Sequence, residues 1–353
     1  MSYLDPRGGT PNPGDGPSSP DGPGAYAAYW APAAEEPAPV GPAPVAPAWD
    51  APTAATSTSE AEYELTAGPR GGKGKRRANP KTSGRAGRNL PAALAVGTGL
   101  GLTVLASLVI WRPAFLAVIA AAATVGIWEM VRALRVTGAE PPMVPLIGGG
   151  LLMTGLAWFA GEDAVVFGLV ITVLAAIVWR LADRPRQFRV DFRASLLIAV
   201  YVPFLISFAV LLVQPEDDGP WRVLCVLIAV ILSDTGGYAA GVFLGKHPMA
   251  PAISPKKSWE GFGGSVTAAA LGSGLLLYFL LDAEVWWGLL FGAVIAVVAV
   301  VGDLAESMLK RDLGIKDMSQ LLPGHGGLMD RLDSILFAVP TAYVLLTLIA
   351  PPG

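Results

Sequence analysis

From Leu90 onward, apolar segments of about 20 residues alternate with short polar connectors. About 20 apolar residues in an α-helix, each rising roughly 1.5 Å, cross a hydrocarbon core of roughly 30 Å. The pattern therefore predicts an all-α polytopic membrane protein with about nine transmembrane helices. Their expected limits are 90–110, 114–134, 143–160, 164–181, 194–213, 221–244, 262–281, 284–303 and 333–350.

Composition supports this fold class. Hydrophobic residues make up 53% of the 353 residues and charged residues only 15%, with a mean hydropathy of +0.52. Soluble domains carry roughly 25% charged residues, so the polar surface of a soluble protein is missing here. A net charge of -3 argues against a protein held on nucleic acid by bulk positive charge. The single cysteine, Cys225, excludes an internal disulfide and a cysteine-rich zinc site.

The first 89 residues have a different character. They hold 15 of the 31 prolines and no apolar run long enough to bury a core, so we expect a disordered N-terminal arm. The end of the arm, residues 70–88, is a basic block that directly precedes the first apolar segment. Residues 90–353 form the expected membrane domain. The first apolar segment lies too far along the chain for a secretory signal peptide.

The positive charges predict the orientation of this domain. If the basic arm is cytoplasmic, 23 of the 25 Lys and Arg residues fall on the cytoplasmic side, and only Arg112 and Arg222 fall on the other. Positive charge is retained on the cytoplasmic face of membrane proteins. We therefore expect a multi-pass protein of the cell membrane with its N-terminus inside and its C-terminus outside.

Two cytoplasmic connectors, 245–261 and 303–333, carry most of the candidate chemistry. The first contains Lys256 and Lys257 between the hydroxyls of Ser254 and Ser258, a set of donors suited to phosphate oxygens. A Lys-Lys pair at a membrane edge also has a plainer interpretation, as a topology anchor.

The second connector is dense in charged residues and glycines. Asp330 and Asp333 are three residues apart, so on a helix they share one face, and grouped carboxylates suit Mg²⁺. The same residues could simply be favourable acids at a helix N-terminus with a local ion pair. His325, flanked by glycines, could be a turn residue, a phosphate donor or a general acid.

Two carboxylates are expected inside the membrane, Asp234 and Glu129. An aspartate in hydrocarbon costs about 2.5–3.5 kcal/mol on insertion scales, so each should face a polar cavity or carry a functional charge. For Glu129, an interhelical hydrogen bond made by a protonated carboxyl is the alternative. We expect residues 233–237, SDTGG, to interrupt their helix and line a protein pocket.

Four segments together resemble the phosphatidate cytidylyltransferase family, also called CDP-diacylglycerol synthases. Most specific is SMLKRDLGIKDMSQLLPGHGGLMDRLD at 307–333, which is similar to the family's C-terminal signature. The others are SDTGGY at 233–238, ISPKKSWEG at 253–261 and GDLAES at 302–307. Departures are small, because Ser258 replaces a frequent Thr and Gly237 a frequent Ala. The resemblance covers residues 90–350.

The resemblance implies transfer of the cytidylyl group of CTP to phosphatidic acid, with release of pyrophosphate, at a site open to the cytoplasm. It implies Mg²⁺ held by Asp303, Asp330 and Asp333, a second cation as an option, and a homodimer. Further catalytic residues would be Asp234, Lys310 and His325. The residues expected to bind CTP and phosphate are Ser254, Lys256, Lys257, Ser258, Arg311, Lys316, Asp317, Gly326, Gly327 and Arg331.

Two other functions share some of these features. A CTP-dependent membrane lipid kinase of the polyprenol type would also use CTP and Mg²⁺, but it would release CDP rather than pyrophosphate. A transporter would also show carboxylates near the membrane midplane. A transporter would not need a 31-residue cytoplasmic connector dense in Asp, Lys and Gly.

Overall fold

The structure is a computed structural model that describes residues 90–183, 187–322 and 326–351. The chain divides into two units, Met1–Arg77 and Ala78–Gly353, and every described residue belongs to the second. The expected disordered arm and its basic block lie outside the described residues, as does His325.

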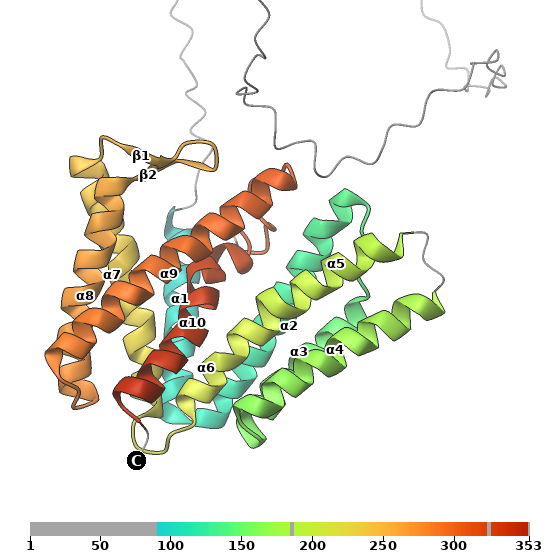
Figure 1. The fold of residues 1–353 in the computed structure, drawn as a ribbon, viewed down its shortest axis with the longest axis horizontal. Coiled ribbons are helices and arrows are strands. Elements are labelled where there is room, and N and C mark those ends of the chain that lie inside the picture. The colour runs from blue at the N-terminus through green and yellow to red at the C-terminus, as the bar shows by residue number, and fades with distance from the viewer. Residues whose placement is uncertain (1–89, 184–186, 323–325, 352–353) are drawn as a thin grey trace, which may run out of the picture. The chain divides into compact units, whose positions relative to one another are not determined.

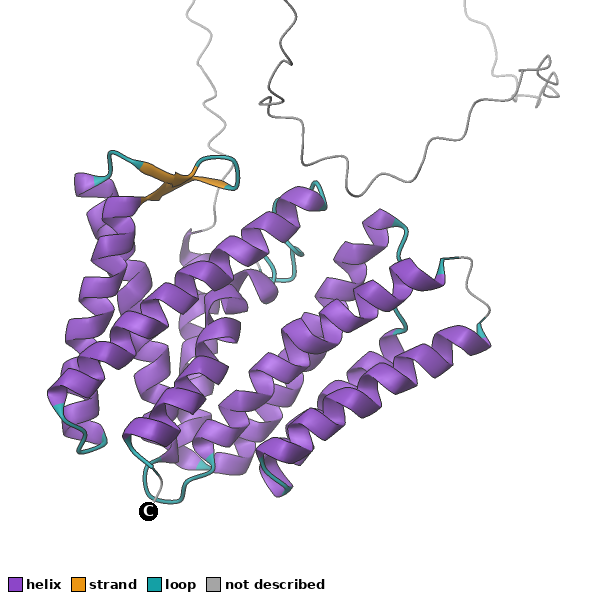
Figure 2. Cartoon of the chain, viewed as in Figure 1, coloured by secondary structure: helices purple, strands orange, loops and turns teal. Residues whose placement is uncertain are grey.

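The described part is a bundle of helices that run alternately up and down, with one small sheet (Figures 1 and 2). The sheet is an antiparallel hairpin of β1 (Pro248–Ala250) and β2 (Ser254–Ser258). The helices are α1 (Leu90–Ile110), α2 (Arg112–Leu134), α3 (Met143–Phe159), α4 (Glu162–Ala182), α5 (Phe188–Ala199), α6 (Leu205–Val213), α7 (Gly219–Leu244), α8 (Trp259–Leu280), α9 (Val285–Asp312) and α10 (Met329–Ile349).

The expected membrane spans coincide with these helices, which confirms an integral membrane protein of largely helical fold. Within the described ranges, seven helices are long and apolar enough to cross a membrane, and two shorter apolar helices, Ala95–Ile110 and Met143–Phe159, accompany them. The exact count of nine spans stays a prediction. The fifth expected span is a composite helix, in which a π-helical turn, Val200–Phe204, joins α5 to α6.

Helices α7 and α8 pack at unusually short range through glycines. A Cβ atom built on Gly236 would lie 2.4 Å from Ala268 Cβ, and one on Gly264 would lie 2.3 Å from Ala240 Cβ. Small residues allow such close packing in membranes, where hydrophobicity gives no net drive for helix association. The expected interruption at 233–237 is wrong, because α7 is continuous from Gly219 to Leu244. Its glycines serve helix contact rather than a broken backbone.

The expected 303–333 loop is also shorter than predicted. Helix α9 continues to Asp312 and α10 begins at Met329, so only residues 313–328 connect them. Asp303, Glu306 and Lys310 are consequently helical residues on one face of α9, spaced by three and four positions. This end of α9 lies beside the N-terminus of α10 and the hairpin (Figure 1).

Candidate active site

A cavity of about 290 Å³ lies where α7, the hairpin, α8 and α9 meet. Its wall combines lysines, carboxylates and hydroxyls with glycines and a few large apolar side chains. The residues around it are Asp234, Gly237, Tyr238, Gly241, Met249, Lys256, Lys257, Ser258, Gly261, Phe262, Ser265, Val300 and Asp303. The structure thus brings the two lysines expected to bind phosphate into one cavity with two of the expected catalytic carboxylates.

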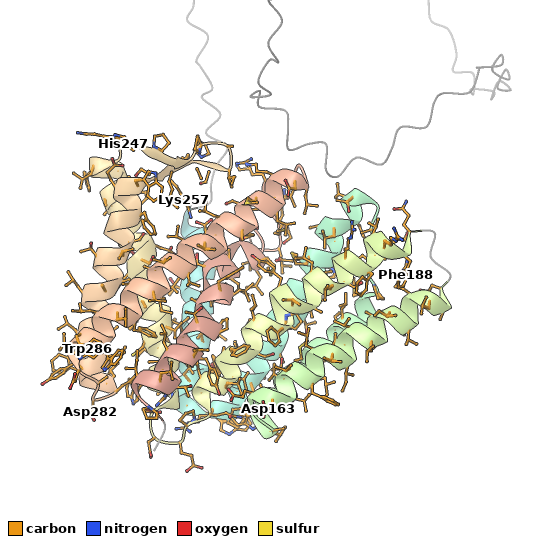
Figure 3. All side chains as sticks on the ribbon, in the orientation of Figure 1. Asp163, Phe188, His247, Lys257, Asp282 and Trp286 are labelled. Atoms are coloured by element: carbon orange, nitrogen blue, oxygen red, sulfur yellow. The ribbon has the colours of Figure 1, made fainter. Side chains whose placement is uncertain are left out.

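The hairpin carries the lysines to this cavity. In its register, Pro248 pairs with Ser258 and Ala250 pairs with Ser254. Lys257 Nζ lies 2.6 Å from Asp303 Oδ2, and the two side chains are 24% and 33% exposed. Figure 3 shows Lys257 at the hairpin end of the bundle. Because this ion pair is open to solvent, an anionic ligand can reach the lysine and a cation can reach the aspartate.

The first turn of α8 anchors the hairpin. Glu260 accepts hydrogen bonds from the backbone N–H groups of Lys246 and His247, and its Oε1 lies 2.5 Å from Nδ1 of His247. Ser258 Oγ accepts a hydrogen bond from Gly261 N at 3.1 Å and caps α8. Ser258 therefore has a structural role in addition to its place in the cavity wall.

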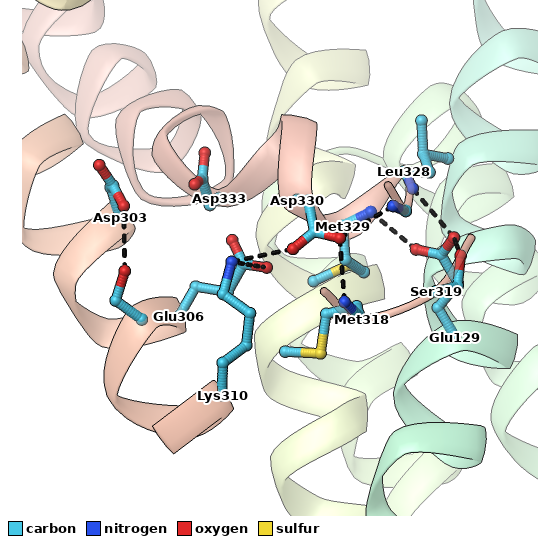
Figure 4. Close-up of polar contacts among 12 residues, drawn as sticks. Glu129, Asp303, Glu306, Lys310, Met318, Ser319, Leu328, Met329, Asp330 and Asp333 are labelled. Atoms are coloured by element: carbon cyan, nitrogen blue, oxygen red, sulfur yellow. Dashed lines mark hydrogen bonds and ion pairs between the residues drawn. The ribbon is translucent and has the colours of Figure 1, made fainter. Parts of the chain in front are cut away.

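Asp303 and Asp333 come together from neighbouring helices (Figure 4). Their approach depends on Gly302, where a Cβ would lie only 2.6 Å from the backbone oxygen of Asp333. Both carboxylates are close enough to Asp234 for their charges to interact with it, and so are Lys257 and Arg331. Three of the expected catalytic aspartates therefore surround one polar region.

Asp330 has different partners from the other two expected metal ligands. Its Oδ1 accepts a hydrogen bond from Lys310 Nζ at 2.8 Å, and its Oδ2 accepts hydrogen bonds from the backbone N–H groups of Met318 (2.9 Å) and Gly327 (2.8 Å). Its side chain is 5% exposed. The carboxylate thus closes the connector onto α10. Over the described ranges, no three His, Cys, Asp or Glu side chains are grouped closely enough to hold a metal ion.

Lys310 bridges two carboxylates at this site. Besides Asp330, its Nζ lies 3.3 Å from Oε1 of Glu306, a residue that is fully buried. Neither oxygen of Glu306 has a hydrogen-bond partner among the described residues. The charge of Glu306 also interacts with that of Asp333. Lys310 is therefore held by the acidic groups rather than free to meet a substrate.

Glu129 is a buried acceptor for the connector. Its Oε1 accepts hydrogen bonds from Ser319 Oγ (2.6 Å) and Leu328 N (2.9 Å), and its Oε2 accepts one from Met329 N (2.8 Å), as Figure 4 shows. These N–H groups belong to the start of α10, where backbone donors lack partners within the helix. An interhelical contact is confirmed, but Glu129 acts in it as an acceptor.

The structure places Lys316 and Asp317 in a second cavity. This cavity, of about 710 Å³, lies between the end of α2 and the connector, and Trp128 and Arg132 also line it. The guanidinium carbon of Arg132 lies 5.6 Å from the centroid of the Trp128 ring. The expected CTP-binding residues therefore do not all line one cavity.

The remaining expected residues lie at the edges of the site. Arg311 donates a hydrogen bond to the backbone oxygen of Ile253 at 3.3 Å, which links α9 to the hairpin. Gly326 has a φ of +81°, a conformation that favours glycine. A Cβ on Gly327 would lie 2.9 Å from Glu129 Oε2, so the connector also requires glycine at that position. These glycines shape the connector.

Two further residues near the carboxylates were not expected from the sequence. Ser265 lines the main cavity and donates a hydrogen bond to Ser233 O at 2.8 Å. Tyr201 lies in the π-helical turn, and the charges of Glu306, Asp333 and Asp303 act on its phenol group. The signal that could have found Tyr201 is Pro203, a helix breaker in the middle of an apolar span.

Comparison with known proteins identifies the family of this chain. The model described as "Cytidylyltransferase family" matches residues 92–349. Proteins named phosphatidate cytidylyltransferase from Mycobacterium bovis and Mycobacterium leprae are 44% and 43% identical to this chain. The matches cover 75% and 77% of this chain and 90% and 92% of those proteins. A protein of the same name from Helicobacter pylori is 33% identical, over 70% of this chain and 90% of its own length. The chain belongs to the cytidylyltransferase family.

Proposed function

We propose that this protein transfers the cytidylyl group of CTP to phosphatidic acid, producing CDP-diacylglycerol and pyrophosphate. The observation that carries the proposal is the cavity in which Lys256 and Lys257 meet Asp234 and Asp303. Lysines bind phosphate oxygens, and carboxylates can hold the cation that such a reaction needs. The names of the bacterial relatives supply the substrate class.

The reaction needs charge control more than proton transfer. An oxygen of the phosphatidate phosphate attacks the α-phosphorus of CTP, a P–O bond forms, and the bond to the β-phosphate breaks to release pyrophosphate. The nucleophile is already anionic, so no strong general base is required. Lys256 and Lys257 would bind the triphosphate as negative charge develops on the departing pyrophosphate. Lys257 can do so by exchanging its ion pair with Asp303 for one with phosphate.

The acidic residues supply the kind of oxygen ligand that a magnesium ion prefers. Asp303 and Asp333 present hard oxygen ligands beside Asp234, and the ammonium of Lys257 on Asp303 shows that this position accepts positive charge. Asp303 and Asp333 would hold the ion, whereas Asp330 would join them only by giving up its hydrogen bonds. When bound, Mg²⁺ neutralises phosphate charge and aligns attack with departure. The family resemblance also implies a second cation as an option, which stays a proposal.

The site is proposed to lie on the cytoplasmic side of a bacterial cell membrane. The main support is the 23-to-2 division of the positive charges, since the hairpin, the end of α9 and the connector all lie on the strongly basic side. CTP would enter from that side, and phosphatidic acid would arrive laterally through the bilayer. Tyr238, which lines the cavity, is 75% exposed on the outer surface of α7, where lipid would meet the cavity wall. A homodimer stays an expectation.

The position of a radioactive label separates this reaction from a CTP-dependent lipid kinase. Purified full-length protein receives phosphatidic acid, Mg²⁺ and CTP labelled either in the α-phosphate or in the γ-phosphate. Cytidylyl transfer moves the α-label into lipid and leaves the γ-label in pyrophosphate. Transfer of the γ-label to lipid, with release of CDP, would refute the proposal.

A further inference from the structure

Buried polar atoms without partners gather at one place beside the active site. In the part of the chain that the structure describes, five buried side-chain oxygens have no hydrogen-bond partner. Three of them belong to Tyr201 and Glu306, and the others are the hydroxyls of Ser233 and Ser273. Native proteins leave few buried polar groups unpaired, so each such group calls for an explanation. The Tyr201 hydroxyl can donate a hydrogen bond, the two oxygens of Glu306 can accept one, and the charge of Glu306 acts on the phenol, so these groups form a complementary set.

The backbone holds Tyr201 firmly in this position. The π-helical turn that contains it packs against α2 and α3 at glycines: a Cβ on Gly126 would lie 2.8 Å from Val202, and one on Gly150 would lie 3.2 Å from Pro203. Turns of this kind inside α-helices occur frequently at functional sites. The Tyr201 ring also packs edge-on against Phe337 of α10, with centroids 5.8 Å apart. Only the hydroxyl group is without a partner.

The carboxylates nearby contact each other and still have acceptor capacity to spare. Oδ1 of Asp333 accepts a hydrogen bond from Ser334 N at 2.6 Å, and the carboxyl group also contacts that of Glu306. Glu306 in addition forms an ion pair with Lys310 through its Oε1. The Tyr201 ring packs on Phe337, one helical turn after Asp333, and the charges of both carboxylates act on its hydroxyl group. A donor at this point would fix which way the Asp333 carboxylate turns.

We propose that Tyr201 is a positioning residue for the transfer reaction, whose hydroxyl donates a hydrogen bond to the Glu306–Asp333 carboxylate pair in the working enzyme. Hydrogen bonds of this kind are often long without substrate and shorten in the reacting complex. The bond turns Asp333 towards Asp303, so that both can act on the same cation. The composite helix α5–α6 thereby contributes to a site whose sequence motifs all lie between α7 and α10. The inference rests on the proposed function.

Tyr201→Phe tests this role with little disturbance, because it removes one oxygen and keeps the ring that contacts Phe337. Loss of one positioning hydrogen bond should lower kcat about 3- to 10-fold and leave the KM for CTP nearly unchanged. The Mg²⁺ concentration for half-maximal rate should rise. The matched control is Tyr343→Phe, which removes a phenol that donates to Glu162 at 2.7 Å. Its partner Glu162 directly precedes Asp163, which Figure 3 labels at the end of the bundle opposite the hairpin, so kcat should not change.

A binding measurement makes the test independent of turnover. Mg²⁺ stabilises the state that binds it, so the rise in Tm with Mg²⁺ reports its affinity without substrate. Tyr201→Phe should need several-fold more Mg²⁺ than the wild type or Tyr343→Phe for the same rise, with an unchanged Tm in the absence of Mg²⁺. If Tyr201→Phe matches the wild type in this titration, the inference is wrong. Wild-type protein that makes no CDP-diacylglycerol would instead refute the proposed function.

Discussion

We expect the loss of Glu129 to misplace the active site, although Glu129 itself does not touch substrate. The side chain is fully buried, and its three hydrogen bonds hold Ser319 of the connector and the backbone of Leu328 and Met329. A carboxylate at a helix N-terminus is also favoured by the helix dipole. Asp330 follows Met329 directly, so the start of α10 carries this constraint straight to the site.

Glu129→Gln keeps the size of the side chain but converts one acceptor oxygen to a donor. If the amide oxygen keeps the two contacts of Oε1, the NH₂ group faces the Met329 N–H, and two donors oppose each other. Hydrogen bonds to a charged group contribute about 1.5–3 kcal/mol, and an unpaired buried donor costs about 1–3 kcal/mol. We therefore expect the start of α10 to lose roughly 2–4 kcal/mol of local stability. Misplacement of the site by about 1 Å can lower a rate by about 100-fold.

The assay pairs turnover with proteolysis. Glu129→Gln should lower kcat/KM for lipid-dependent pyrophosphate release by at least about tenfold, since roughly 1.4 kcal/mol corresponds to tenfold. Trypsin should cleave the connector at Lys316 faster than in the wild type, because the loop is less firmly closed. Glu140→Gln is the control, because that acidic side chain is 76% exposed. If Glu129→Gln has the turnover and the resistance to trypsin of the wild type, Glu129 does not hold the connector and the start of α10 in place.

Three further predictions follow from other contacts. Asp330→Asn should lower Tm as well as turnover, since it weakens the closure of the connector and leaves the half-buried Lys310 poorly paired; an unchanged Tm would contradict this role. Gly264→Ala should lower the free energy of unfolding by about 1–3 kcal/mol through overpacking, and circular dichroism should show a lower Tm. In a Cys225→Ala background, a cysteine at Ser319 should react with impermeant maleimide from the cytoplasmic side only and one at Asp217 from outside only. Reaction of the cysteine at Ser319 from outside would overturn the orientation.

The sequence predicts the long helices well because the bilayer imposes a simple requirement on composition. An apolar run of spanning length leaves few choices other than a helix, so the limits of α1 to α10 were within a few residues of expectation in most cases. The error at α9 has a physical cause. A helix can continue beyond the membrane into polar sequence, and nothing in the composition of residues 304–312 distinguishes that continuation from a loop.

The candidate site was predictable only as a set of residues. Asp330 and Asp333 were expected to share one face, but the partners of Asp330 come from α9 and the connector, which spacing along one helix cannot reveal. Glycines at 233–237 fit a broken helix and a close helix contact equally, and only the position of α8 decides between them. Tyr201 resembles any aromatic residue of a membrane span until its hydroxyl is found beside the carboxylates.

We expect lipid cytidylyl transfer to take place between α7, the hairpin and the facing ends of α9 and α10. The most direct measurement is the rate of phosphatidate-dependent pyrophosphate release by purified full-length wild type, Asp303→Asn, Asp333→Asn and the control Asp183→Asn, whose side chain is 53% exposed. The wild type and Asp183→Asn should release pyrophosphate and form CDP-diacylglycerol at similar rates. Each of the other two variants should be slower by roughly 100-fold or more, with an unchanged Tm. Normal turnover in both, with an unchanged dependence on Mg²⁺, would mean that the reaction takes place elsewhere in the molecule.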